Sequence, residues 1–166
     1  MIIRGQWLRG RAWFRAVLAL SDGNRIPLWL QADTAATHTV IAGNVIPSAY
    51  ARGRRVKAPP IRTLLGYVPS FLLPGTDMFL VDSHDRRVFH RVNATVIQFV
   101  EGIRLGCMQR RAFRKVLNVA GDVWEPPRNL LGQDVLSRFI LVAREPDLLF
   151  LTDDPEFHEV ALDLAR

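Results

Sequence analysis

The chain has 166 residues, enough for one domain with a sizeable core, so we expect a single domain over residues 1–166. Hydrophobic residues make up 49% of the chain and charged residues 23%, which excludes a largely disordered protein. The net charge is +6: residues 1–115 carry 18 basic and 6 acidic side chains, and residues 116–166 carry 4 and 10. The basic part could attract nucleic acid or acidic protein segments, but no nucleic-acid-binding motif accompanies it.

The cysteine content and the hydropathy pattern indicate the cellular compartment in which the protein is expected. Cys107 is the sole cysteine, so one chain cannot form an internal disulfide or a zinc site built on several cysteines. The first residues carry scattered arginines in place of the apolar stretch of a signal peptide. No segment reaches the roughly 18 apolar residues of a membrane span. We therefore expect a cytoplasmic protein with no membrane partner.

The first half of the chain is predicted to begin with a β-hairpin. Its strands are residues 11–20 and 26–32, joined by the turn sequence SDGN at residues 21–24. A short strand at residues 38–42 and a short helix around residues 47–52 follow. The basic segment 51–60 ends in two prolines and is predicted to be a loop, because proline cannot occupy a central strand. Residues 63–75 are apolar but interrupted by glycine and proline, which favours an exposed hairpin or lid.

The second half is also predicted to be mostly strands. Residues 78–100 suggest two strands around a polar turn at residues 82–85, and residues 113–119 a further strand before a loop at 121–129. Residues 130–139 suggest a strand end, a glycine turn and a short helix, followed by a final hairpin over residues 139–152. Asp154 is a plausible N-cap and Pro155 a first helical residue, so we expect a C-terminal helix over about residues 155–165. The fold class is therefore mainly β.

A single carboxylate in the segment LWLQADTAATHTVI, residues 28–41, is the most distinctive chemical feature. Asp33 follows an apolar run, and four small or hydroxylated residues come after it: Thr34, Ala35, Ala36 and Thr37. One interpretation is a turn aspartate that accepts hydrogen bonds from nearby backbone N–H groups. The other is a catalytic carboxylate on a tight loop, where small neighbours allow two backbones to approach closely.

This segment resembles the active-site loop of retropepsin-like aspartic proteases, in which apolar residues precede Asp-Thr/Ser-Gly. A second segment, Leu130-Leu131-Gly132-Gln133-Asp134-Val135-Leu136, is similar to that family's C-terminal turn and short helix. The order of the predicted elements resembles that of the family over about residues 11–152, although only the two short segments match a specific sequence pattern. It implies a closed, β-barrel-like acid-protease fold with one short helix near the C-terminal motif.

The resemblance also implies roles for individual residues. Asp33 would be catalytic, Thr34 would brace the loop of a symmetry mate, and Leu130, Leu131 and Gly132 would pack beneath the active-site loop. A flap would cover bound peptide, with residues 63–75 as the candidate and Leu65, Gly66 and Tyr67 near its tip. This sequence departs from the pattern at Ala35, where the family usually has glycine, and at Gln31, where it usually has an apolar residue.

The chemistry of this family requires two carboxylates that share one proton. One deprotonates the attacking water while the other protonates the carbonyl oxygen, and two like charges a few Å apart cannot both ionise; aspartic proteases are the standard example. The chain has one such motif, so the second Asp33 would come from a second copy in a symmetric homodimer. The expected partners are thus a second copy and a peptide or protein substrate, and no cofactor is expected.

Other functions remain as alternatives. Ala35 leaves room for a catalytically inactive retropepsin-like domain that dimerises or binds peptides. The Arg-rich residues 1–115 leave room for a basic β-barrel adaptor that binds acidic partners or nucleic acid. His84, Asp85 and His90 lack a known metal-ligand spacing, so a solvated turn is preferred there and no metal site is expected.

Overall fold

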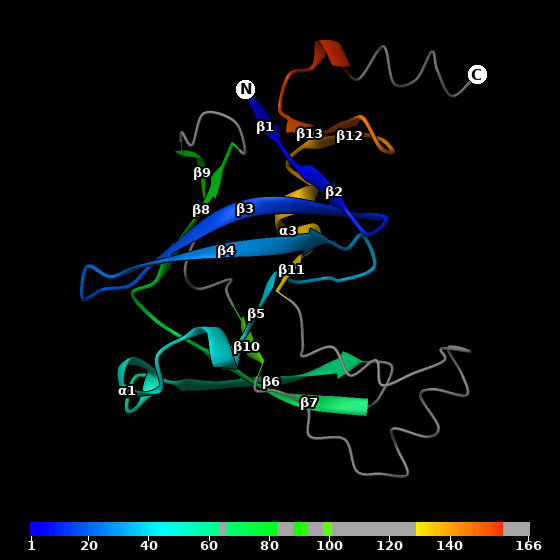
Figure 1. The fold of residues 1–166 in the computed structure, drawn as a ribbon. Coiled ribbons are helices and arrows are strands. Elements are labelled where there is room, and N and C mark those ends of the chain that lie inside the picture. Colours follow the sequence, from blue (N-terminus) through cyan, green and yellow to red (C-terminus); the bar gives the residue numbers. More distant parts are fainter. Residues whose placement is uncertain (64–65, 83–87, 93–97, 101–128, 158–166) are drawn as a thin grey trace.

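The computed structural model describes residues 1–63, 66–82, 88–92, 98–100 and 129–157 (Figure 1). These ranges contain mostly strands with a few short helices, which confirms the mainly β class. The predicted strand at 113–119, most of the loop at 121–129, and the C-terminal helix after residue 157 lie outside the described residues. No helix in the described ranges is both long and apolar enough to cross a membrane.

Most of the strands belong to one sheet. Its order is β6-β7-β10-β5-β11-β4-β3-β8-β9, with β2 paired to β3. The bounds of its strands are β2 Gln6–Leu8, β3 Arg11–Ala19, β4 Arg25–Ala32, β5 Val40–Ala42, β6 Val56–Thr63, β7 Gly66–Leu72, β8 Asp77–Val81, β9 Val88–Val92, β10 Gln98–Val100 and β11 Leu130–Leu131. A smaller sheet has the order β1-β13-β12, with β1 at Ile2–Arg4, β12 at Ile140–Arg144 and β13 at Leu148–Thr152.

The short helices occur at two connections. After β5, the 3-10 helix η1 (Gly43–Val45) and the helix α1 (Ser48–Ala51) lead toward β6. After β11, the helix α3 (Gln133–Leu136) leads toward β12. Short helices had been predicted around residues 47–52 and within residues 130–139, and α1 and α3 confirm them.

The predicted β3–β4 hairpin is confirmed, with Trp13 opposite Gln31 and Ala19 opposite Arg25. Alternate side chains of β3 and β4 point into the core: Phe14 and Leu30, directly opposite each other, are both fully buried. Burying a side chain of this size contributes about 1.5–3 kcal/mol, so this face fixes the register of the hairpin. The position of Asp33, one residue beyond β4, is set by that register.

The first arm of the flap candidate differs from the prediction. Residues 51–60 were predicted to be a loop, but Val56–Thr63 form β6, which pairs with β7. Pro59 and Pro60 are accommodated because β6 pairs only with β7 among the described strands and its register shifts between Ala58 and Ile61. The Ser70 hydroxyl donates to the Pro59 carbonyl at 2.6 Å, so a side chain of β7 adds a hydrogen bond between the strands where the register shifts. The hairpin therefore runs from residue 56 to 72 and not from 63 to 75.

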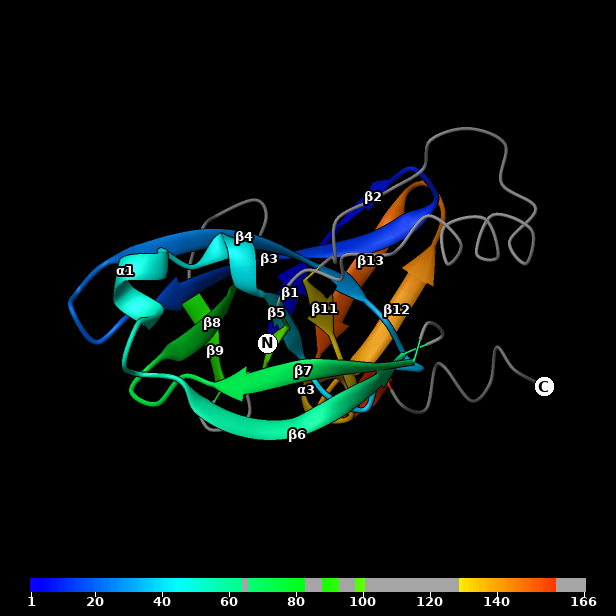
Figure 2. The ribbon, with the colours of Figure 1, turned by 90° about the horizontal axis from the view of Figure 1, so that it is seen from below.

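The arrangement of the layers brings the hairpin end and the Asp33 loop to the same side. Figure 1 shows the β3–β4 hairpin across the middle of the molecule, the β1-β13-β12 sheet above it and the β6–β7 hairpin below it. Figure 2, seen from below, shows that the loop after β4 and the end of the hairpin where β6 passes to β7 both lie on the right, as in Figure 1.

Candidate active site

Asp33 lies in a loop that connects two strands with a third strand between them. Strand β11 pairs in parallel with β4, with Leu131 opposite Ala32, and antiparallel with β5, with Leu130 opposite Val40. The chain therefore leaves β4 at Ala32, passes over the end of β11 and returns in β5. This topology brings residues 28–41 next to residues 130–136, the two segments that carry the resemblance.

The Asp33 loop is a tight turn with its carboxylate held in place. The Asp33 N–H donates to the Leu131 carbonyl at 3.1 Å, and the Ala36 N–H donates to the Asp33 carbonyl at 3.1 Å. The Ala35 N–H donates to Asp33 Oδ1 at 2.9 Å. Asp33 is partly exposed, and its Oδ2 makes no hydrogen bond with the described residues. One carboxylate oxygen is thus fixed and the other is available.

The loop caps the N-terminus of α3. The Gln133 N–H donates to the Ala36 carbonyl at 2.8 Å, and the Asp134 N–H donates to the Thr37 carbonyl at 3.2 Å. The Gln133 side-chain amide also donates to the Thr34 carbonyl at 3.0 Å. These bonds satisfy donors that a helix start leaves without intrahelical partners, so helix and loop stabilise each other.

Gly132 permits this close packing. An ideal Cβ at position 132 would lie 2.4 Å from the His38 carbonyl carbon and 2.8 Å from the Thr39 nitrogen. Backbone atoms cannot move aside as the end of a flexible side chain can, so a side chain at this position would push the loop away. Leu130 and Leu131, just before this glycine, pair with β4 and β5 on either side.

Ala35 meets the backbone requirements of its position. Among the described residues that are not glycine, only Arg9 has a positive φ, so Ala35 lies outside the left-handed region. Its side chain is exposed, and its N–H makes the bond to Asp33 that a glycine would make. Within one protomer, alanine therefore replaces glycine here without backbone strain.

A buried polar cluster beneath the loop had not been predicted. Thr39 is fully buried; its hydroxyl and its N–H both donate to Asp134 Oδ1, at 2.7 and 2.8 Å. The Gly132 N–H in turn donates to the Thr39 hydroxyl oxygen at 3.1 Å. Asp134 Oδ2 is buried and has no hydrogen-bond partner among the described residues. This cluster joins β5, the glycine turn and α3.

Asn129 is a second residue that the sequence analysis missed. Its side chain accepts a hydrogen bond from the Ala42 N–H at 2.9 Å and donates to the Trp29 carbonyl at 3.3 Å. Its own carbonyl accepts from the Gln31 N–H at 3.0 Å. Asn129 therefore ties β4 to β5 just before β11. A lone Asn ahead of an apolar pair gives no local signal for such a contact.

The remaining predicted residues lie around this centre. The Gln31 side chain accepts a hydrogen bond from Arg11 at 3.1 Å, on the strand that delivers Asp33. Tyr67, one residue into β7, is 72% exposed. Leu65 and the metal candidates His84 and Asp85 lie outside the described residues. In the described ranges no group of three or more His, Cys, Asp or Glu residues could hold a metal ion.

Comparison with known proteins gave matches to solved structures. The protease of EIAV, in a complex with the inhibitor HBY-793, is 18% identical, with a TM-score of 0.42 over 78% of this chain and 88% of that chain. A retropepsin-like aspartic protease from Rickettsia conorii is also 18% identical, with a TM-score of 0.41 over 91% of this chain and 88% of that chain. Both of these proteins are proteases. Neither the family models nor the curated proteins gave a match.

Both of these solved structures share little sequence with this chain. What the site can do follows from its own contacts, above all those of Asp33 with Ala35 and Leu131.

Proposed function

We propose that the chain is an aspartic endopeptidase whose active site forms between two copies, each of which contributes Asp33. The observation that carries the proposal is the state of the Asp33 carboxylate. One of its oxygens accepts the Ala35 N–H at 2.9 Å, and the other makes no hydrogen bond with the described residues. A turn aspartate with a purely structural role would not need a loop buttressed by a second segment about 100 residues away in sequence, with a glycine at the contact.

The need for a second copy follows from the carboxylates near the loop. Among the described residues, Asp134 lies beneath the loop, where its Oδ1 accepts two hydrogen bonds from Thr39 and its Oδ2 is buried. In the described part of the chain, the loop therefore offers one available carboxylate, that of Asp33. A twofold axis beside Asp33 would bring a second, identical carboxylate to the first.

The proposed reaction uses the pair as acid and base. The ionised carboxylate takes a proton from water, whose oxygen attacks the peptide carbonyl carbon, while the protonated carboxyl gives its proton to the carbonyl oxygen. The tetrahedral intermediate then loses the amine, which leaves with a proton returned from the pair. The Ala35 N–H in each copy fixes one oxygen of each carboxylate and so orients the other toward the water.

An extended peptide would bind between the copies, beneath the two β6–β7 hairpins. Strand-like backbone hydrogen bonds and side-chain pockets are the common way in which proteins hold such peptides. The exposed Tyr67 near the end of the hairpin is a suitable apolar contact for the substrate.

The proposal is tested by comparing the wild-type protein with Asp33→Asn on a peptide library between about pH 3.5 and 7, where carboxylate pairs titrate. We expect the wild type to cleave peptides and Asp33→Asn to lose cleavage, because an amide cannot take up the proton. Asp147→Asn, at an exposed turn between β12 and β13, is the matched control and should retain activity. Absence of cleavage by the wild type, or equal cleavage by Asp33→Asn, would contradict the proposal.

A further inference from the structure

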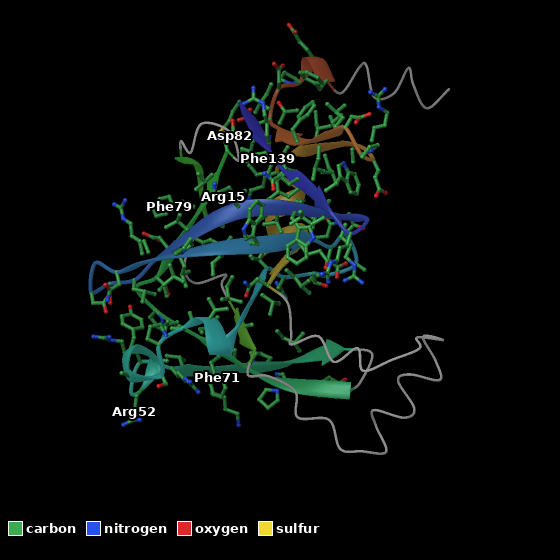
Figure 3. The ribbon with its side chains drawn as sticks, viewed as in Figure 1. Arg15, Arg52, Phe71, Phe79, Asp82 and Phe139 are labelled. Atoms are coloured by element: carbon green, nitrogen blue, oxygen red, sulfur yellow. The ribbon has the colours of Figure 1, made fainter. Side chains whose placement is uncertain are left out.

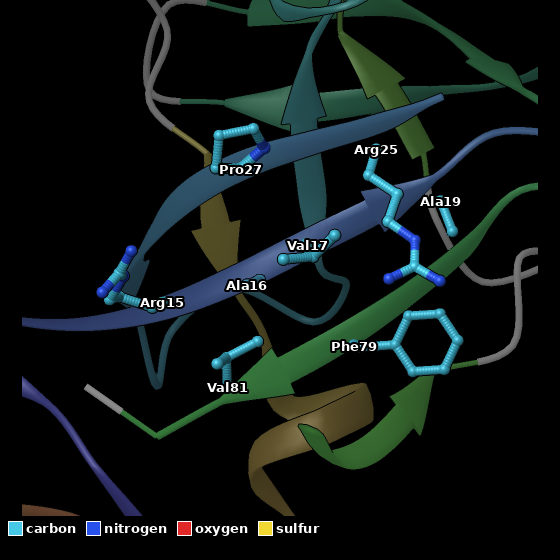
Figure 4. A pocket seen from close by; sticks show the side chains of 8 residues that line it. All are labelled: Arg15, Ala16, Val17, Ala19, Arg25, Pro27, Phe79 and Val81. Atoms are coloured by element: carbon cyan, nitrogen blue, oxygen red, sulfur yellow. The ribbon is translucent and has the colours of Figure 1, made fainter. Parts of the chain in front are cut away.

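A concave region lies on the outer face of the β4-β3-β8 part of the large sheet. A pocket of about 460 Å³ opens there, lined by Arg15, Ala16, Val17, Ala19, Arg25, Pro27, Phe79 and Val81 (Figure 4). Cavities of roughly 300–1,000 Å³ are the usual size for small-molecule sites. The centre of the pocket is about six residues from Asp33 along β4, or about 20 Å, so it is separate from the proposed active site.

Strand pairing explains both the floor and the ends of this pocket. Val17 lies opposite Pro27 on β4 and opposite Phe79 on β8, which gives an apolar middle row. Two residues before Val17 on β3, Arg15 lies opposite Trp29 on β4 and Val81 on β8. Two residues after Val17, Ala19 lies opposite Arg25 on β4 and Asp77 on β8. The small side chains of Val17 and Ala19 between larger neighbours leave the hollow.

The two arginines are the polar groups of the pocket. Neither forms an ion pair with any residue in the described parts of the chain. The Arg15 guanidinium lies 5.6 Å from the centroid of the Trp29 ring. This contact orients the guanidinium without neutralising its positive charge. Figure 4 shows the Arg25 side chain extending across β3 toward the Phe79 ring. Asp77 on β8 lies opposite Ala19, as Arg25 does on β4, but Asp77 does not line the pocket.

These features select a class of ligand by charge and polarity. An apolar floor favours an apolar body, and the guanidinium groups at its two ends favour a carboxylate, which arginine binds through paired N–H donors. A cation would be repelled, and a neutral apolar molecule would gain nothing from either arginine. We propose that this pocket binds a small organic anion with an apolar body and a carboxylate group.

Decanoate is a suitable probe, used below its micelle concentration with calorimetry or NMR titration of the full chain. Decanol and decyltrimethylammonium carry the same apolar chain with a neutral or a cationic head. We expect decanoate to bind about tenfold or more tightly than decanol, because the carboxylate can accept paired, charge-assisted hydrogen bonds from a guanidinium and the hydroxyl cannot. Decyltrimethylammonium should not compete with decanoate.

Two double variants of equal net charge then test the site itself. Arg15→Gln with Arg25→Gln should weaken decanoate binding about tenfold, to the level of decanol. Arg52→Gln with Arg138→Gln changes two exposed arginines outside the pocket and should leave binding unchanged. Figure 3 shows Arg52 far from Arg15, at the opposite side of the β3–β4 hairpin.

Filling the pocket gives a further test that does not depend on charge. Val17→Trp should abolish decanoate binding while circular dichroism shows an unchanged fold. The proposal is overturned if the wild type fails to bind decanoate, binds decanol equally well, or if the two double variants behave alike. Because every readout is binding, these outcomes are independent of the peptidase activity.

Discussion

At the scale of single residues, Ala35 is where this chain departs from the Asp-Thr-Gly pattern that residues 28–41 resemble. The structure gives a physical reason why alanine is acceptable: its φ is not positive, its side chain is exposed and its N–H bonds Asp33 Oδ1. Residue 35 must therefore supply the backbone N–H that donates to Asp33. The sequence pattern alone could not separate this requirement from the need for a glycine backbone.

Two substitutions at Ala35 therefore predict opposite outcomes. Ala35→Gly retains the N–H and should keep kcat/KM within a few-fold, at a stability cost of about 0.4–1 kcal/mol from added freedom in the unfolded chain. Ala35→Pro removes the donor to Asp33 and should abolish peptide cleavage. Kinetics on one peptide, with thermal denaturation of each variant, provides the measurement. A large gain of activity in Ala35→Gly would show instead that the Cβ obstructs the site.

Thr39 is the residue whose role the sequence concealed most completely. It looks like one of several hydroxylated residues after Asp33, but it is fully buried and makes three hydrogen bonds, to Asp134 and Gly132. Its partners lie about 95 residues away, and no local pattern reports a polar contact at that separation. Asp33 and Gly132 could be found because their neighbours form recognisable short motifs.

Thr39→Val should lower the free energy of unfolding by about 1–3 kcal/mol, because the hydroxyl is lost and the Gly132 N–H is left buried without a partner. Thr37→Val is the matched control, since Thr37 is exposed in the same loop. Urea denaturation of both variants measures the difference. An equal change in the two variants would contradict a structural role for the buried hydroxyl.

At the scale of elements, the sequence was most informative where turn residues and apolar alternation agreed. The β3–β4 hairpin, the glycine turn before α3 and the β12–β13 hairpin all follow from such local signals. It was misleading at β6, because Pro59 and Pro60 were taken as evidence for a loop. An outer strand whose register shifts beside the prolines tolerates them, and position in a sheet cannot be read from one strand alone.

The corrected β6–β7 hairpin sharpens the prediction of a flap. If its end covers bound peptide, Tyr67 loses water contact on binding, and Tyr67→Ser should lower kcat/KM about tenfold through a higher KM. Val56→Ser, at the other end of the same hairpin, where the side chain is 50% exposed, should have little effect. Steady-state kinetics measures both. Equal effects would show that the end of the hairpin does not contact the substrate.

At the scale of the whole molecule, the proposed reaction requires two copies of the chain. The described part of one protomer provides a braced loop with one available carboxylate, that of Asp33, and the proposed chemistry needs a pair. The sequence could predict this requirement from the single motif. It could not predict the outer pocket between Arg15 and Arg25, because that hollow depends on which side chains of three strands meet across the sheet.

Mixing wild-type and Asp33→Asn chains in equal amounts, after unfolding and refolding together, tests the shared site most directly. Random pairing makes about a quarter of the dimers wild type in both halves, so a site that needs both carboxylates should keep about a quarter of the activity of the same total amount of wild-type protein. Refolding with Asp147→Asn in place of Asp33→Asn should leave activity unchanged. Retention of about half of the activity in the Asp33→Asn mixture, as expected if each chain acts alone, would contradict the account.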